Sequence, residues 1–194
     1  ETDVKGWNAA SNTKIGTPKH TLEITTEEKV SGNSSLKLTY EDAWKDNLYR
    51  KFYQGVACKP NTTYKWGFKA KAKNAKSIHA SITGGNPYNE RIILSDGTYD
   101  WTDFDYEYTT DSNTTALNFC FFFMATTEAF YLDDLYIYES GKENINLLEN
   151  GGFEEKWDDG QYIQYDASLA DTVIKKLELC RENNISADML ISPH

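Results

Sequence analysis

Short runs of alternating apolar and polar residues fill the chain from His20 to Glu139, and clusters of turn-forming residues separate them. A period of two is typical of a β-strand with one buried face and one exposed face. The turn clusters include residues 31–33, 84–87 and 96–97. The pattern predicts nine strands, at residues 21–25, 35–40, 47–58, 63–72, 77–83, 91–95, 103–110, 115–123 and 129–138.

The alternation within these runs separates a core face from an outer face. In the fourth run Tyr64, Trp66 and Phe68 alternate with lysines and a glycine. In the eighth run Phe119 and Phe121 alternate with other residues in the same way. Evenly spaced strands without an intervening helical period predict two stacked antiparallel sheets, an all-β sandwich of the jelly-roll kind.

The end of the chain has a different pattern. Leu169, Val173 and Leu177 stand close to helical spacing within residues 167–184, and residues 185–191 form a short apolar run. A helix followed by a strand is typical of an α/β fold. The sequence therefore predicts a short helix-strand tail after the sandwich.

Composition narrows the class of protein. The 194 residues include 20 Lys and Arg against 30 Asp and Glu, a net charge of −10, and 14% of them are aromatic. This charge disfavours a nucleic-acid partner, and the absence of a long apolar run disfavours a membrane partner. The aromatic content is too high for a disordered acidic tail. The chain opens on Glu1 rather than Met, which is typical of a piece of a longer protein.

No catalytic or zinc-binding constellation is evident. The cysteines Cys58, Cys120 and Cys180 are far apart and form no CxxC pattern, so neither a disulfide framework nor a zinc site is predicted. The three histidines have no spacing with Ser or Cys that indicates a nucleophile. Acidic pairs such as Asp133 and Asp134 arise readily in a chain with 30 carboxylates. No catalytic residue is predicted.

Residues 146–157 carry the sequence Asn-Leu-Leu-Glu-Asn-Gly-Gly-Phe-Glu-Glu-Lys-Trp, and residues 1–7 carry a shortened echo in which Glu1 aligns with Glu154. The longer copy resembles the opening of the β-sandwich carbohydrate-binding modules attached to bacterial glycoside hydrolases. Other segments resemble later parts of these modules in the same order, at residues 30–38, 56–72, 100–102 and 130–135.

Residues 177–194 resemble an early helix-strand unit of a (β/α)₈ glycosidase barrel. Together the resemblances imply a sandwich module at residues 1–140, a linker at 141–156 that repeats the module-opening motif, and a barrel fragment at 157–194. The catalytic carboxylates of such barrels lie at later strand ends. The chain is therefore predicted not to be an enzyme, and its parent is predicted to be a secreted or cell-surface bacterial protein.

Sugar recognition requires exposed aromatic planes beside fixed polar groups. Loop aromatics flanked by polar residues and outer-face strand residues meet this requirement, although a strand tyrosine or a lone histidine is more often a packed residue. The predicted carbohydrate-binding residues are Trp44, Tyr49, Tyr53, Lys69, His79, Tyr88, Arg91, Glu107, Asn118 and Phe122.

The resemblance also implies a structural Ca²⁺ ion. In these modules the ion lies between the Glu that opens the fold, the Ser-Gly turn and an acid on the final strand; Glu1, Ser31, Ser34 and Asp133 stand at the matching positions. Calcium takes six to eight oxygen ligands, which carboxylates and carbonyls can supply. The alternative is that Asp133 belongs to a solvated turn.

The predicted function is non-catalytic binding of a polysaccharide or oligosaccharide, which targets a parent glycoside hydrolase to its substrate. The parent catalytic domain is the second predicted partner. Two alternatives remain: a sandwich that packs on the catalytic domain without binding glycan, and an ancillary part of a truncated glycosidase. The net charge favours a neutral glycan over an anionic one, although Lys65, Lys69 and Arg91 offset this locally.

Overall fold

The computed structural model describes residues 3–11, 20–41, 50–84 and 90–157. The chain divides into two compact units, Glu1–Lys156 and Trp157–His194. The predicted helix-strand tail and barrel fragment lie outside the described residues. The described part contains no helix and ten strands: β1 (Asn8–Ser11), β2 (His20–Thr25), β3 (Ser35–Tyr40), β4 (Arg50–Ala57), β5 (Thr63–Ala75), β6 (Ile78–Thr83), β7 (Glu90–Ile93), β8 (Gly97–Thr109), β9 (Ala116–Phe123) and β10 (Thr127–Glu139).

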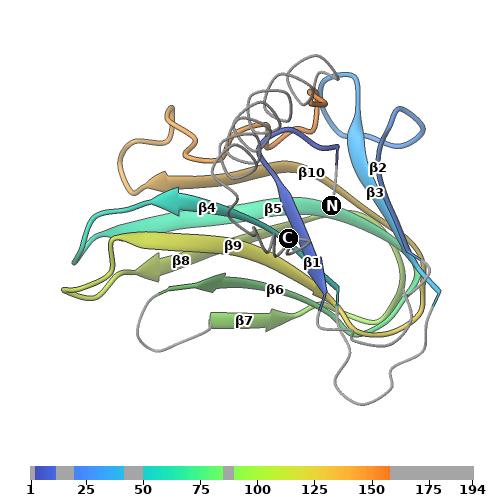
Figure 1. Ribbon diagram of the computed structural model, residues 1–194, viewed down its shortest axis with the longest axis horizontal. Helices are drawn as coiled ribbons and strands as arrows, with labels where there is room; N and C mark the ends of the chain where they lie inside the picture. The colour runs from blue at the N-terminus through green and yellow to red at the C-terminus, as the bar shows by residue number, and fades with distance from the viewer. Residues whose placement is uncertain (1–2, 12–19, 42–49, 85–89, 158–194) are drawn as a thin grey trace, which may run out of the picture. The chain divides into compact units, whose positions relative to one another are not determined.

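The strands form two five-stranded sheets, which Figure 1 shows as two layers. Sheet A has the order β1-β4-β9-β6-β7, and sheet B has the order β2-β3-β10-β5-β8. Neighbouring strands pair antiparallel in both sheets. The predicted antiparallel two-sheet sandwich is confirmed.

Most strands lie close to their predicted positions, and the differences have structural reasons. β8 begins at Gly97 rather than at residue 103, because it follows the full length of β5 through two register shifts, from Gly97 opposite Ala75 to Thr109 opposite Thr63. β1 was not predicted, since Asn-Ala-Ala-Ser has no apolar alternation. Pairing with β4, with Asn8 opposite Tyr53, makes it a strand.

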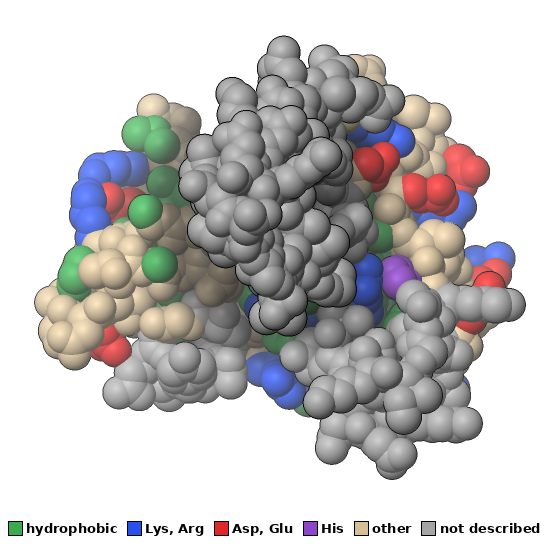
Figure 2. Space-filling view, in the orientation of Figure 1, with side chains coloured by type: hydrophobic (Ala, Val, Ile, Leu, Met, Phe, Trp, Pro, Cys, Tyr) green, Lys and Arg blue, Asp and Glu red, His purple; other side chains and the backbone are tan. Residues whose placement is uncertain are grey.

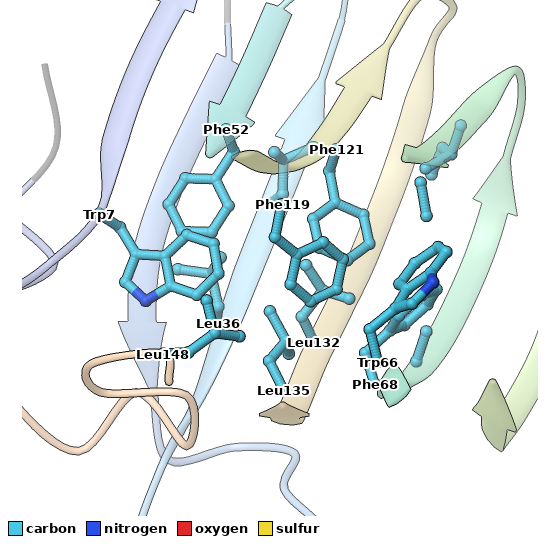
Figure 3. Packing of buried hydrophobic residues seen from close by; sticks show 14 of the residues in the cluster. Trp7, Leu36, Phe52, Trp66, Phe68, Phe119, Phe121, Leu132, Leu135 and Leu148 are labelled. Atoms are coloured by element: carbon cyan, nitrogen blue, oxygen red, sulfur yellow. The ribbon is translucent and has the colours of Figure 1, made fainter. Parts of the chain in front are cut away.

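Aromatic side chains from both sheets meet in the core (Figure 3). Trp66 of β5 is fully buried, as predicted, and its ring meets the edge of Phe119 of β9 at 5.4 Å between centroids. Phe68 meets Phe121 in the same geometry at 4.9 Å. Pairs of this kind contribute about 0.5–1.5 kcal/mol each beyond the apolar area they bury. These contacts hold the two sheets together.

Residues 146–156, expected to be part of a linker, pack into the sandwich. Phe153 is fully buried, with its ring centroid 5.6 Å from that of Trp7 and 6.1 Å from that of Phe52. Leu148 is 6% exposed and belongs to the same core. The apolar side chains of the segment are part of the core of the sandwich, and the segment belongs to the first compact unit.

Candidate functional site

The outer face of sheet A brings together five of the predicted strand residues. In an antiparallel sheet, residues directly opposite each other share a face. The register of sheet A therefore defines two outward rows that cross all five strands. The first row is Asn8, Tyr53, Cys120, Ser81 and Arg91, and the second is Ala10, Lys51, Phe122, His79 and Ile93. Asn118 lies on the same face, opposite Gly55.

Two aromatic rings and two cations occupy the middle of this face. Phe122 and Tyr53 are half-buried. The Lys51 ammonium lies 4.0 Å from the centroid of the Tyr53 ring and 5.9 Å from that of Phe122. The Arg91 guanidinium carbon lies 5.5 Å from the Phe122 centroid. Cations at such distances are attracted to the ring face. In Figure 2, Lys and Arg side chains and a histidine lie among hydrophobic side chains on the viewed face.

Two polar side chains on the same face have atoms without partners. His79 is 9% exposed and Ser81 is 1% exposed. Within the described residues His79 Nδ1 and Ser81 Oγ have no hydrogen-bond partner. Leaving such an atom unpaired costs about 1–3 kcal/mol. The face therefore carries polar groups that gain from a ligand or a water molecule that reaches them.

The pKa of His79 is lowered, chiefly by burial and also by the positive charge of Arg91, while Asp96 acts in the opposite direction. The imidazole is therefore neutral at pH 7, with one nitrogen as donor and the other as acceptor. A neutral imidazole can bond to a hydroxyl group in either direction.

Two predicted residues, Lys69 and Glu107, do not belong to this face. Both point outward from sheet B, Lys69 on β5 and Glu107 on β8, whereas the outer faces of a sandwich point in opposite directions. The Lys69 ammonium lies 3.6 Å from a carboxylate oxygen of Asp103 and 3.4 Å from one of Asp134. The expectation that these residues share one surface with Tyr53 and the others is therefore wrong. Trp44, Tyr49 and Tyr88 lie outside the described residues.

The predicted metal site corresponds to a turn held by a buried carboxylate. Asp133 of β10 is fully buried. Its Oδ2 accepts hydrogen bonds from the backbone N–H groups of Val30, at 2.7 Å, and Ser31, at 3.1 Å, and its Oδ1 accepts one from Asp134 N at 2.8 Å. Burial raises the pKa of Asp133, although these three hydrogen bonds favour the charged form.

A second carboxylate, that of Glu154, binds the same turn. It accepts hydrogen bonds from Asn33 N, at 2.9 and 3.1 Å, and from Ser34 N, at 3.1 Å. Ser34 Oγ donates to the carbonyl of Phe153 at 2.9 Å. Glu154 thus takes the place at the turn that the sequence assigned to Glu1, which lies outside the described residues. The described ranges hold no group of three or more His, Cys, Asp or Glu side chains arranged for a metal ion.

Sequence reasoning did not single out three residues that the structure places at these sites: Lys51, Ser81 and Glu154. Lys51 and Ser81 stand two positions from the predicted Tyr53 and His79, so the alternation could have found them. Glu154 was recognised only as part of a repeated motif.

No protein-family model matches the chain, and a comparison with curated proteins finds no match. Solved structures of similar fold include TmCBM61 in complex with β-1,4-galactotriose, with a TM-score of 0.54 and 11% identity over 71% of this chain and 90% of that one. A family 16 carbohydrate-binding module has a TM-score of 0.50 and 24% identity over 70% and 92%.

The enzymatically active domain of tailspike protein 4 from bacteriophage CBA120 has a TM-score of 0.56 and 13% identity over 70% of this chain. The match spans only 20% of that phage chain. At these identities the likeness shows the fold alone, a β-sandwich that these structures share. The described ranges include no helix with the length and apolar character to cross a membrane.

Proposed function

We propose that this chain is a non-catalytic carbohydrate-binding module and that it binds its glycan on the outer face of sheet A. The observation that carries the proposal is the arrangement on that face: half-buried Tyr53 and Phe122 lie beside the polar side chains of His79, Ser81 and Asn118. The fold supports it, since solved structures of similar fold include carbohydrate-binding modules.

The chemistry of these residues suits a sugar. The apolar face of a pyranose ring stacks on an aromatic plane, and Phe122 is the middle residue of the second row, on the central strand of sheet A. The hydroxyl groups around the ring donate to and accept from the Asn118 amide, the neutral His79 ring and the Ser81 hydroxyl. Water competes for the same polar groups, so a single module binds weakly. A module tethered to an enzyme raises the effective concentration of the polysaccharide.

Affinity electrophoresis in gels that contain plant or algal polysaccharides tests the proposal. We expect at least one glycan to retard the chain, and Phe122→Ala to weaken that retardation about tenfold, since a stacked ring contributes roughly 0.5–1.5 kcal/mol beyond its buried area. Tyr131→Ala is the matched control, because Tyr131 is a half-buried aromatic residue on the outer face of sheet B. Equal effects of the two variants, or no retardation by any glycan, would contradict the proposal.

We also propose that the module belongs to a secreted or cell-surface bacterial glycoside hydrolase and holds its catalytic domain near a polysaccharide. The resemblance of residues 177–194 to a glycosidase barrel supports this. Because the proposed role of this chain is binding alone, the purified chain should release no reducing sugar from a glycan that it binds. Measurable turnover would overturn the assignment of a binding role alone.

We propose, further, a structural Ca²⁺ ion at the turn formed by residues 30–34. Two carboxylates, of Asp133 and Glu154, bind this turn, and the backbone carbonyls there are hard oxygen ligands of the kind that calcium takes. Ser31 and Ser34 belong to the proposed set; Glu154 replaces Glu1 in it.

Thermal unfolding tests the calcium proposal. Addition of a chelator should lower the melting temperature, and excess Ca²⁺ should restore it, because a ligand of the folded state stabilises that state. Asp133→Asn should abolish the response. The Lys73→Gln variant, altered at an exposed residue on the outer face of sheet B, should keep it. A melting temperature that neither chelator nor Ca²⁺ changes would count against the site.

A further inference from the structure

Charged side chains are distributed differently on the outer faces of the two sheets. On sheet B the lysines are close to carboxylates: Lys37 to Glu27 at 2.9 Å, Lys65 to Glu143 at 3.8 Å, Lys69 to Asp103 and Asp134, Lys71 to Glu28 at 3.0 Å and Asp100 at 3.2 Å, and Lys73 to Glu128. Their positive charge is therefore largely neutralised by side chains of the protein itself.

On sheet A the cations have aromatic neighbours instead. Among the described residues, no carboxylate lies within 4.0 Å of the Lys51 ammonium or the Arg91 guanidinium. No residue of the two outward rows is acidic. Asp96, whose charge acts on His79, accepts a hydrogen bond from Ser77 N at 2.9 Å in the turn before β8.

The two cations approach one ring from strands on either side of it. In sheet A, Lys51 belongs to β4, Phe122 to β9 and Arg91 to β7, and the strand order is β1-β4-β9-β6-β7. The ammonium and the guanidinium carbon lie at similar distances from the Phe122 centroid, 5.9 and 5.5 Å. A sugar ring that packs against Phe122 therefore lies close to both positive charges.

We propose that the outer face of sheet A binds an acidic polysaccharide, with carboxylates on its sugar rings, in preference to a neutral one. This inference rests on the proposed function and names its ligand class. A uronic acid has the apolar ring face that stacks on Phe122 and a carboxylate at the ring edge. The guanidinium fork of Arg91 matches a carboxylate with two parallel hydrogen bonds, and Lys51 pairs with a carboxylate as a point charge.

The experiment compares one backbone with and without its charge. Isothermal titration calorimetry measures binding to polygalacturonate and to the same polymer after methyl esterification, which removes the carboxylate charge. Unsubstituted galactan and xylan are the neutral ligands, and dextran sulfate, with dextran as its neutral form, tests whether any polyanion suffices. At low salt we expect polygalacturonate to bind at least about tenfold more tightly than its ester, with a difference that shrinks as salt is added.

Variants place the binding on sheet A. Arg91→Gln and Lys51→Gln should each remove a large part of the preference for the charged polymer over its ester. Lys73→Gln, which removes an exposed lysine on sheet B, is the matched control and should bind as the parent chain does. A loss of preference in this control as large as in the sheet A variants would overturn the location.

The outcomes separate this inference from the function on which it rests. Equal binding of the acid and its ester, or binding of galactan or xylan alone, would overturn the acidic ligand and leave carbohydrate binding standing. Equal or tighter binding of dextran sulfate would overturn the assignment to carboxylates. If the chain binds none of these polymers and no other glycan, the proposed function itself is overturned.

Discussion

Replacement of Phe153 with alanine should destabilise the sandwich by about 3–5 kcal/mol, the usual cost when a buried phenylalanine is cut back to alanine. Phe153 is fully buried, and its ring packs against the rings of both Trp7 and Phe52. Neither ring can fill the space, because Trp7 and Phe52 already stack on each other at 4.6 Å with an interplanar angle of 10°. The loss therefore includes a cavity as well as buried area.

This loss is a large part of the stability of a domain, which is usually about 5–15 kcal/mol. For a domain of this size, each kcal/mol corresponds to roughly 2–4 °C in melting temperature, so we expect a fall of about 6–20 °C. The backbone of the segment is anchored separately. Gln54 donates to the carbonyl of Glu149 at 2.9 Å and accepts from its N–H at 2.7 Å. The variant should therefore fold, with a lower stability.

Urea unfolding followed by tryptophan fluorescence measures the effect, and an unchanged m-value shows that stability alone has changed. Ile145→Ala is the control in the same part of the chain. Ile145 is 53% exposed, so its loss should change the unfolding free energy by less than about 0.5 kcal/mol. If the two variants unfold at the same urea concentration, residues 146–156 do not fold together with the sandwich, and the reasoning fails.

Three further predictions concern single positions. Gly67→Ala should lower the free energy of unfolding in urea by about 1–3 kcal/mol, because a Cβ there would clash with the carbonyl of Phe104 and lie 2.6 Å from the Tyr136 hydroxyl. An unchanged urea midpoint would contradict this, since it would show that β8 can move away from β5 without loss of stability. Glu154→Gln should lower the free energy of unfolding by about 1 kcal/mol, because a neutral amide accepts the hydrogen bonds from the turn more weakly than the charged carboxylate does. Burial raises the pKa of Asp133 in the folded state above its value in the unfolded chain, near 4. The protonated carboxyl group therefore stabilises the fold at a pH below the unfolded-state pKa, and this contribution is lost as the pH rises through the folded-state pKa. In chelator, the stability of the parent chain relative to Asp133→Asn should therefore fall from about pH 3 to neutral, and a flat difference would contradict the shift.

The strands could be predicted from the sequence because each carries its own alternation. The membership of a strand in one sheet or the other could not. Lys69 and Phe122 both stand on the outward side of their strands, yet β5 pairs with β8 and β10 while β9 pairs with β4 and β6. Alternation fixes the face of a residue on its own strand, whereas long-range pairing decides which strands share a surface. Lys69 and Glu107 were therefore assigned to the wrong side of the sandwich.

The repeated motif shows a second limit of local patterns. Its two copies present a glutamate in the same context, Glu1 and Glu154, so the sequence alone does not show which one binds the turn at residues 33–34. Packing decides it in the described structure: Phe153 enters the core beside Trp7, and this places Glu154 at the backbone N–H groups of the turn.

The net charge of −10 and the cations of sheet A act on a ligand over different distances, which gives a last prediction. At 0.1 M salt the screening length is about 10 Å, so an approaching polyanion is repelled by the whole molecule only at low ionic strength. Once the polyanion is bound on the outer face of sheet A, the positive charges of the neighbouring Lys51 and Arg91 dominate its electrostatic interaction with the protein.

For immobilised polygalacturonate, added salt should therefore raise the association rate constant, because it screens the repulsion. It should also raise the dissociation rate constant, because it weakens the ion pairs with Lys51 and Arg91. Surface plasmon resonance across a salt series measures both. An association rate constant that falls steeply with salt would mean that the field of the whole chain attracts the polymer, contrary to a local pair of cations on an acidic protein.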